Sequence, residues 1–214
     1  MNILTLQDVA YSYEGSKKKV FEHLSYEFEE GKIYAIVGRS GAGKTTLLSL
    51  LSGLDSPTEG SILFKDKDIR RIDRYQYRSK YVGIIFQSFN LLPHLTAVEN
   101  VILSMDVSGM KYKNKKEKAM ELLGKVGLSE DEARRRVLKL SGGQQQRGAI
   151  ARTLSYEPEV ILADEPTGNL DKETEDEIMG IFHTLAQEGK CIIIVTHSQE
   201  VAQQADEVKK LSCK

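Results

Sequence analysis

The residues best suited to chemistry form a glycine-rich segment that follows the apolar run Lys32–Val37 and precedes a helix-like pattern. The segment consists of Gly38, Arg39, Ser40, Gly41, Ala42, Gly43, Lys44 and Thr45, with Thr46 directly after it. Its spacing, G-x-x-x-x-G-K followed by Ser or Thr, is typical of a loop that binds phosphate groups. The glycines let the backbone curl so that N–H groups point at phosphate oxygens, and the following helix adds partial positive charge.

Within this loop, the two polar side chains at the start of the helix have distinct expected roles. Lys44 can reach the β- and γ-phosphates of a nucleotide, and the Thr45 hydroxyl can ligate Mg²⁺. The alternative, a glycine-rich turn with an incidental lysine, is disfavoured because the segment lies between a strand pattern and a helix pattern, as the motif requires. The loop alone predicts only nucleotide binding, since nucleotide kinases and GTPases share it.

A pair of acidic residues, Asp164 and Glu165, directly follows the apolar run Val160–Ala163. An apolar strand that ends in Asp places a carboxylate at the C-terminal edge of a sheet, where α/β folds bind ligands. We therefore expect Asp164 to hold the magnesium shell through water and Glu165 to polarise the attacking water. The alternative is that the pair simply begins a helix, as acidic residues often do. The phosphate loop favours the first interpretation.

A second glycine-containing segment opens another predicted helix. It consists of Ser141, Gly142, Gly143 and Gln144, and the helix that follows has apolar positions at Ile150 and Leu154. The exposed N–H groups at its N-terminus suit a γ-phosphate. Taken alone, the segment would be an ordinary helix capped by serine. A chain that holds a nucleotide in its own phosphate loop has no use for two such sites on one nucleotide.

The elements around these segments predict an α/β fold. Two short strands, Ile3–Ala10 and Val20–Glu27, flank a polar turn at Tyr13–Lys19, which predicts an antiparallel β region at the N-terminus. The runs Lys32–Val37 and Tyr81–Phe86 are typical of buried strands. Between them lies a helix, with Gly53 near its end and an apolar face at Leu47, Leu50, Leu51 and Leu54.

The middle of the chain, from about Leu91 to Leu154, has a helical pattern. One apolar face is formed by Ala119, Leu122, Leu123 and Val126, and Gly127 is expected to cap that helix. Strand patterns return at Val160–Ala163 and Cys191–Val195, on either side of a helix with Ile178, Ile181, Phe182 and Leu185 on one face. Strands buried on both faces predict a mainly parallel sheet. We expect one domain over residues 1–214, a P-loop NTPase core with a helical subdomain inserted at about residues 88–155.

The segment Leu140–Gln144, followed by Gln-Gln-Arg, resembles the LSGGQ signature of ABC ATPases, and the resemblance extends over essentially the whole chain. It implies that Ser141–Gln144 closes over the ATP of the opposite subunit. It also implies that Gln87 touches Mg²⁺ and senses a membrane partner, and that Asp171 belongs to a loop at the dimer interface. His197 resembles the histidine that hydrogen-bonds the γ-phosphate.

The same resemblance concerns the adenine. Tyr13 lies where the family places an aromatic residue that stacks on this base, with Tyr11 as the weaker candidate. Within the family, Phe89–Val101 and Ala163–Asp171 are similar to a branch that includes lipoprotein-releasing, macrolide-exporting, cell-division and antimicrobial-peptide-resistance systems. This likeness implies a separate integral-membrane permease.

The expected function is therefore an ATP-binding and ATP-hydrolysing subunit, with ATP and Mg²⁺ as cofactors, that dimerises with a second copy around two ATP to drive the permease. One alternative is a mechanotransmitter or sensor subunit coupled to a membrane partner without transport. Another is a soluble ABC ATPase of DNA repair or translation, but Gln87 and Ser141 are too close in sequence to enclose a long coiled coil. An ATPase subunit of this kind is not expected to contact the cargo directly.

Composition sets further limits. The chain has 30 Lys and Arg against 31 Asp and Glu, so no basic field favours a nucleic-acid partner. No apolar run approaches the ~18 to 20 residues that cross a bilayer, and the N-terminus has no signal-peptide pattern. Cys191 and Cys213 are too few for a disulfide framework or a zinc cluster. We expect a cytoplasmic protein, peripheral on the inner face of the cell membrane, and no regulatory domain after the terminal Val208–Lys214.

Overall fold

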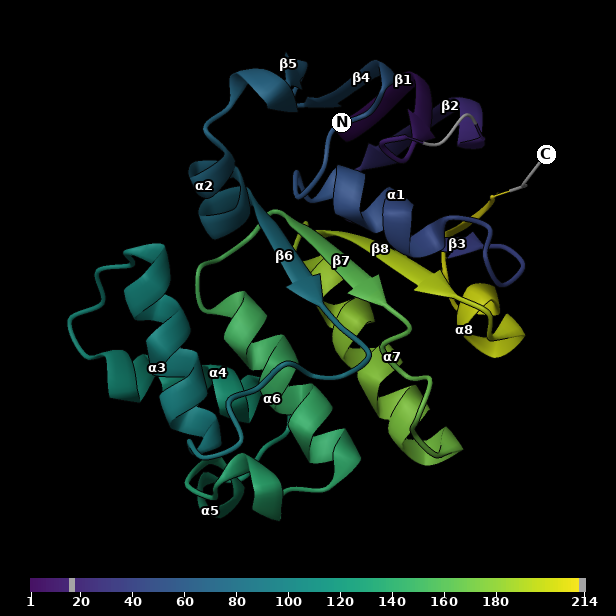
Figure 1. Cartoon of the computed structure of the whole chain (residues 1–214). Helices are drawn as coiled ribbons and strands as arrows, with labels where there is room; N and C mark the ends of the chain where they lie inside the picture. Colours follow the sequence, from purple (N-terminus) through teal and green to yellow (C-terminus); the bar gives the residue numbers. More distant parts are fainter. Residues whose placement is uncertain (16–17, 212–214) are drawn as a thin grey trace.

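A computed structural model describes residues 1–15 and 18–211 (Figure 1). Residues 16 and 17 of the expected polar turn, and residues 212–214 of the terminal segment, which include Cys213, lie outside the described residues. Within the described residues, none of the helices combines the length and apolarity that a membrane crossing requires.

A five-stranded parallel sheet forms the centre of the molecule, in the order β6-β7-β8-β3-β9. Its strands are β3 (Ile33–Val37), β6 (Val82–Ile85), β7 (Val160–Asp164), β8 (Cys191–Thr196) and β9 (Glu207–Lys210). All residues of β8 and the first four of β7 are buried, because packed layers cover both faces of the sheet. The predicted parallel sheet is confirmed.

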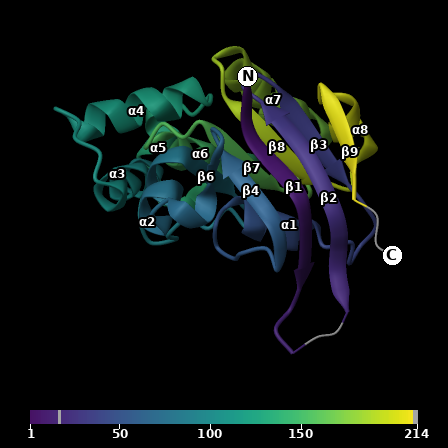
Figure 2. The ribbon, with the colours of Figure 1, turned by 90° about the horizontal axis from the view of Figure 1, so that it is seen from above.

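Alternate residues of these central strands belong to two different hydrophobic clusters. Ile161 and Ile192 face the cluster that includes α3, α4, α6 and α7, whereas Leu162 and Ile193 face the cluster that includes α1 and the N-terminal sheet. This alternation is the two-residue period of a strand. The central sheet therefore lies between an antiparallel layer on one side and a helical layer on the other (Figures 1 and 2).

The predicted antiparallel β region is a four-stranded sheet in the order β2-β1-β4-β5. Its strands are β1 (Asn2–Ser12), β2 (Lys19–Glu29), β4 (Glu59–Phe64) and β5 (Lys67–Asp68). At Gly60, φ is +78° and an added Cβ would lie 2.4 Å from the carbonyl oxygens of Gln7 and Asp8. Glycine at this position lets β4 approach β1 closely.

The helices divide into those that flank the sheet and those inserted between β6 and β7. The first group is α1 (Lys44–Leu51), α2 (Arg74–Gln76), α7 (Lys172–Gln187) and α8 (Gln199–Gln203). The inserted group is α3 (Ala97–Ser108), α4 (Lys115–Lys125), α5 (Glu130–Ala133) and α6 (Gly142–Leu154), at the lower left of Figure 1. Short turns complete the chain: η1 (Ile69–Arg71), η3 (Val137–Lys139) and the π-helical turn η2 (Tyr77–Tyr81).

Two details differ from the sequence-based expectation. The helix after the phosphate loop ends at Leu51, and Leu54 lies outside it with 52% of its surface exposed, so Leu54 is not part of the apolar face. Strand β9 lies in what the sequence suggested was only a tail. The prediction missed this strand because a sheet-edge strand with alternating exposure has little apolar signal. Cys191 is fully buried in β8, as expected.

Candidate functional site

A cleft of about 560 Å³ opens where the phosphate loop meets the end of β7. It is lined by Tyr13, Lys18, Lys19, Val20, Ser40, Gly41, Ala42, Gly43, Lys44, Thr45, Thr46, Gln87, Asp164 and Glu165. Parallel strands place their carboxyl ends along one edge of a sheet, which explains why segments so distant in sequence meet here. The cleft thus brings together most of the residues expected to handle the nucleotide.

The phosphate loop connects β3 to α1, with Gly43 at the N-cap of the helix. Gly43 has φ +87°, and an added Cβ would lie 2.4 Å from Cγ1 of Val20. Only glycine fits this position without moving the antiparallel layer. The N-terminus of α1 therefore faces the cleft, where its N–H groups are placed to bind anions.

The two polar side chains at the start of α1 already have partners. Lys44 Nζ donates a hydrogen bond to the carbonyl oxygen of Gly38 at 2.9 Å and a longer one to that of Arg39 at 3.4 Å. Thr45 Oγ1 donates to Asp164 Oδ2 at 3.2 Å. The hydroxyl of α1 and the carboxylate of β7 are thus joined directly across the floor of the cleft.

Asp164 has the electrostatic environment expected of a cation ligand. Burial raises the pKa of its carboxyl, the hydrogen bond from Thr45 opposes this rise, and the neighbouring Glu165 raises it further. The described residues contain no group of three or more His, Cys, Asp or Glu side chains that could hold a metal. Mg²⁺ commonly needs only one or two protein oxygens besides water and substrate phosphates, and the Thr45–Asp164 pair fits that requirement.

Glu165 lies at the end of β7 and is held by β8. Its Oε1 is 2.8 Å from Nδ1 of His197, and its Oε2 accepts from Thr196 Oγ1 at 3.2 Å and from the backbone N–H of His197 at 3.3 Å. The Glu165 backbone has φ +45°, an uncommon value for a residue with a side chain, and its N–H donates to the carbonyl oxygen of Val195 at 2.9 Å. This glutamate is therefore fixed in both backbone and side chain.

Thr196 was missed at the sequence level, although it directly precedes His197. Its side chain is 1% exposed and helps to orient Glu165. The sequence signal for Thr196 was a hydroxyl residue at the end of a buried strand, directly before a candidate histidine.

Gln87 does line the cleft, and an added Cβ on Gly168 would lie 3.2 Å from Gln87 Nε2. Gly168 therefore makes room for the glutamine.

The two candidate tyrosines differ clearly. Tyr13 is 56% exposed at the rim of the cleft, and its hydroxyl lies 2.6 Å from Thr46 Oγ1. Tyr11 is buried, donates to Asp55, and meets the Tyr13 ring edge-on at 5.2 Å. Tyr13 alone of this pair has a free ring face large enough to stack on a base.

The signature segment does not reach this cleft. Ser141 caps α6: its Oγ accepts from the Gln144 N–H at 3.3 Å, and its own N–H donates to Gln144 Oε1 at 2.8 Å. At Gly143, an added Cβ would lie 2.5 Å from Cγ2 of Thr174, so glycine allows α6 to pack closely on α7. Among the described residues lining the cleft, none belongs to Ser141–Gln144.

Asp171 also lies apart from the cleft lining. It caps α7, with Oδ1 accepting from the Thr174 N–H at 2.9 Å, and this hydrogen bond lowers the pKa of its carboxyl. An added Cβ on Gly142 would be 3.5 Å from the Leu170 side chain, so this loop and the signature segment are neighbours.

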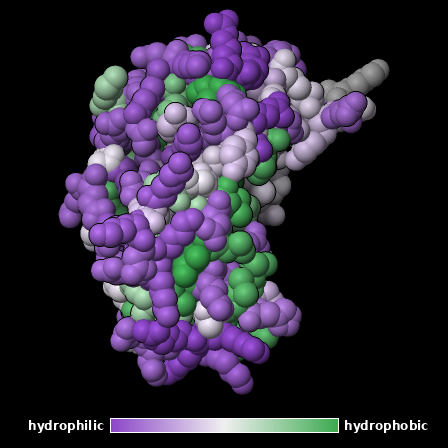
Figure 3. Space-filling view, turned by 90° about the vertical axis from the view of Figure 1, so that its left-hand side faces the viewer, coloured by the Kyte–Doolittle hydropathy of each residue, from purple (hydrophilic) through white to green (hydrophobic). Residues whose placement is uncertain are grey.

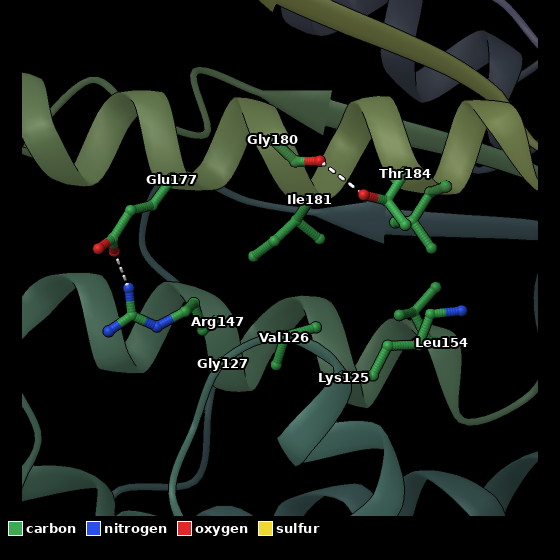
Figure 4. A pocket seen from close by; sticks show the side chains of 10 residues that line it. Lys125, Val126, Gly127, Arg147, Leu154, Glu177, Gly180, Ile181 and Thr184 are labelled. Carbon is green, nitrogen blue, oxygen red and sulfur yellow. Dashed lines mark hydrogen bonds and ion pairs between the residues drawn. The ribbon is translucent and has the colours of Figure 1, made fainter.

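A separate cavity of about 370 Å³ lies between α6 and α7 (Figure 4). Val126, Leu154 and Ile181 line it, and an ion pair between Arg147 and Glu177 crosses one end. It contains none of the residues expected to handle the nucleotide.

Comparison with known proteins identifies the family. The sequence profile described as "ABC transporter" matches residues 21–168. An uncharacterised ABC transporter ATP-binding protein of Bacillus subtilis is 47% identical over 207 residues, covering 96% of this chain and 92% of the relative. The macrolide export ATP-binding/permease protein MacB of Shigella flexneri is 42% identical over 211 residues, covering 96% of this chain but 32% of that protein.

Solved structures agree with the sequence relatives. The dimeric ABC transporter cassette MJ0796 superposes with a TM-score of 0.87 at 35% identity, covering 97% of this chain and 94% of that chain. The same cassette, in a dimeric post-hydrolysis state with ADP and Pi, also has a TM-score of 0.87. The chain therefore belongs to the ABC transporter family. It is an ATP-binding subunit with ATPase activity, and these relatives do not favour the mechanotransmitter alternative.

Proposed function

We propose that the cleft binds ATP, with each residue acting from the position described above. Tyr13 stacks on the adenine, and the loop Gly38–Thr46 wraps the phosphates. Lys44 exchanges its bonds to loop carbonyls for bonds to the β- and γ-phosphates, because charged oxygens are stronger acceptors than neutral ones. The hydrogen bonds of this lysine to Gly38 and Arg39 support the proposal, since they hold its ammonium group beside the curled backbone.

Thr45, Asp164 and Gln87 are the residues that would hold Mg²⁺ in this cleft. When bound, the ion neutralises charge on the phosphate oxygens. The Thr45–Asp164 hydrogen bond and the burial of Asp164 support this assignment. Asp164 stays ionised in this role because a cation would offset the cost of its burial.

Glu165 is the proposed catalytic base. Its carboxylate accepts a proton from, or orients, the attacking water, while His197 and Thr196 keep the side chain aimed into the cleft. The proposal is supported by the three hydrogen bonds that Glu165 forms with Thr196 and His197 and by its position among the lining residues. His197, whose side chain is 71% exposed beside Glu165, is proposed to bind the γ-phosphate as well.

The signature segment is proposed to complete the site of a second copy. Ser141–Gln144 lies outside its own chain's cleft, and its helix N-terminus suits a phosphate. Two copies arranged around two ATP would join each phosphate loop to the partner's signature, with Asp171 near the interface. This separation of cleft and signature within one chain is the observation that carries the proposal.

A separate integral-membrane permease is the proposed second partner. Large apolar side chains are exposed beside the inserted helices: Tyr75, Leu92, Leu103 and Val107. Figure 3 shows apolar surface on the face that carries α2 and α3. MacB, whose name includes a permease, extends well beyond the part that matches this chain. We therefore propose a location on the cytoplasmic face of the cell membrane, held there by the permease.

A mixing experiment tests the composite site. Ser141→Arg removes a functional signature and Lys44→Ala a functional phosphate loop, so each variant alone should lack ATPase activity. Their heterodimer contains one site with both parts intact, and the mixture should recover part of the wild-type rate. Wild-type specific activity should also rise with protein concentration. A monomeric wild type with a concentration-independent specific rate would contradict the proposal.

A further inference from the structure

Two tyrosines in the segment Arg74–Tyr81, outside the ATP cleft, donate hydrogen bonds to the ends of two different helices. Tyr77 reaches α1, the helix that begins with Lys44, and Tyr75 reaches α3, in the inserted helical group. A helix leaves its last carbonyl groups without partners inside the helix, so each such contact satisfies an otherwise orphaned acceptor.

At α1, the tyrosine completes the C-terminal cap. Backbone N–H groups of the following residues satisfy the carbonyl oxygens of Leu48, Ser49 and Leu50. The carbonyl oxygen of Leu51 instead accepts from the Tyr77 hydroxyl at 2.9 Å. Tyr77 is 1% exposed, and burial raises the pKa of its phenol, so the hydroxyl remains a donor.

Arg78 strengthens this cap. Its Nη1 donates to the carbonyl oxygen of Gly53 at 3.0 Å, just past the end of α1. A cation at this end of a helix also interacts favourably with the helix dipole. Gly53 has φ +69°, and an added Cβ would lie 3.0 Å from the Tyr77 ring. The end of α1 is thus shaped around Tyr77 and Arg78.

At α3, the arrangement is repeated on the surface. The N–H groups of Gly109 and Met110 satisfy the carbonyl oxygens of Met105 and Asp106, whereas that of Val107 accepts from the Tyr75 hydroxyl. Tyr75 and Val107 are 57% and 60% exposed. This end of the segment therefore lies on the exposed apolar face.

A π-helical turn begins at Tyr77 and links this segment to the central sheet. The turn spans Tyr77–Tyr81 and leads directly into β6, after which the chain reaches Gln87. π-Helical turns are rare and occur often at functional positions. An eight-residue helix such as α1 is too short to be stable alone, so its position depends on its tertiary contacts.

We propose that Arg74–Tyr81 is a brace that sets the position of α1, and hence of Lys44 and Thr45, according to the position of α3. Tyr77 and Arg78 act as positioning residues for ATP binding, and Tyr75 connects them to the helical group. The inference rests on the proposed binding of the phosphates by Lys44 and Thr45. It adds a connection to the phosphate loop that does not pass through Gln87.

Isothermal titration of ATP into the full chain tests the brace through a double-mutant cycle. Tyr77→Phe keeps the buried ring and removes only the donor, and should raise the Kd for ATP about two- to fivefold. Tyr75→Phe should raise it about twofold. Because Tyr75 acts on α1 only through Tyr77 and Arg78, the double variant should raise the Kd by less than the product of the two single effects.

Matched variants separate positioning from simple loss of stability. Arg78→Met should raise the Kd, whereas Arg71→Met, at an exposed arginine that donates no hydrogen bond to α1 or α3 within the described chain, should leave it unchanged. A lowered melting temperature with an unchanged Kd in Tyr77→Phe, or additive effects of the two tyrosines, would overturn the brace.

A parallel titration of Lys44→Ala distinguishes failure of the phosphate-loop assignment from failure of the brace. Normal ATP affinity in Lys44→Ala refutes the phosphate-loop assignment itself. Weakened affinity in Lys44→Ala beside normal affinity in Tyr77→Phe refutes only the brace.

Discussion

The ATP cleft and the N-terminus of α6 are both proposed to bind phosphate, but they are organised differently. In the cleft, side chains from separate elements hydrogen-bond one another, as in the pairs Thr45–Asp164 and Glu165–His197. At α6, the side chains of Ser141 and Gln144 form hydrogen bonds within the first turn of the helix and with Glu132 from α5. The first region is a tertiary site, and the second is a locally capped helix end.

This difference supports the proposal that the two parts of one chain do not share a ligand. The cleft depends on how the core strands meet, so the fold itself positions its catalytic groups. The start of α6 is held by its own capping box and by Glu132 and Thr174 from the neighbouring helices, so none of its contacts comes from the cleft. The following predictions test whether the two regions are as separate as their contacts indicate.

The largest effect is expected in the cleft, from Glu165→Gln. This substitution keeps the side-chain shape but removes the base, and a general base contributes ~10² to 10⁴ in rate. Steady-state ATP hydrolysis should therefore show a fall in kcat of that size. Glu173→Gln, at an exposed acid in the first turn of α7, is the matched control and should retain the wild-type rate. Should Glu165→Gln hydrolyse normally, His197 becomes the candidate for the catalytic role.

A smaller effect, on the affinity for ATP, distinguishes the cleft from the start of α6. Lys44→Ala removes a charged donor to phosphate and should weaken ATP binding roughly 10- to 100-fold without unfolding the chain. Ser141→Arg changes the other region and should leave the monomer's ATP affinity within about twofold of wild type. Isothermal titration of both variants gives the comparison. Equal losses in the two would show that a single chain uses both regions for one nucleotide.

A still smaller effect is expected on the thermal stability of the fold, and on its dependence on pH, when Asp164 is changed. The pKa of Asp164 is raised in the folded protein. The stability that this carboxyl contributes is therefore fully present below its unfolded pKa, and it is lost as the pH rises through the folded pKa. At neutral pH its ionised form therefore destabilises the fold. Asp164→Asn should raise the melting temperature by roughly 1–3 °C at pH 7 and less at acidic pH. Thermal melts at several pH values measure this, and a lowered melting temperature at pH 7 would contradict it.

At Asp171, the contribution of the carboxyl to stability should depend on pH in the opposite direction. Hydrogen bonds from Thr174 lower the pKa of its carboxyl, so its contribution to stability is present above the unfolded pKa and lost as pH falls through the folded pKa. Asp171→Asn should slightly lower the melting temperature at pH 7, and the difference from wild type should shrink in acid. An effect of the same sign as that of Asp164→Asn would show that the cap of α7 does not depend on charge.

Much of this arrangement could be predicted from the sequence, because its signals are local. The phosphate loop is a short motif, and the meeting of Thr45 with Asp164 follows from parallel strands that end at one edge. The strands β5 and β9 could not be predicted because they are short and lie at sheet edges, and β4 was missed because it depends on pairing with the distant β1. The positive φ of Glu165 could not be predicted either, because the surrounding fold imposes it.

The central claim is that ATP joins the cleft of one chain to the signature of another, and the dimeric state of Glu165→Gln tests it most directly. Blocking hydrolysis preserves the bridge between Lys44 and the partner's signature, so the dimer accumulates by mass action. Light scattering behind a sizing column should show Glu165→Gln as mainly a dimer in ATP with Mg²⁺ and wild type as mainly a monomer. ADP, which lacks the bridging phosphate, should leave both as monomers. A Glu165→Gln protein that binds ATP yet remains monomeric would contradict the account.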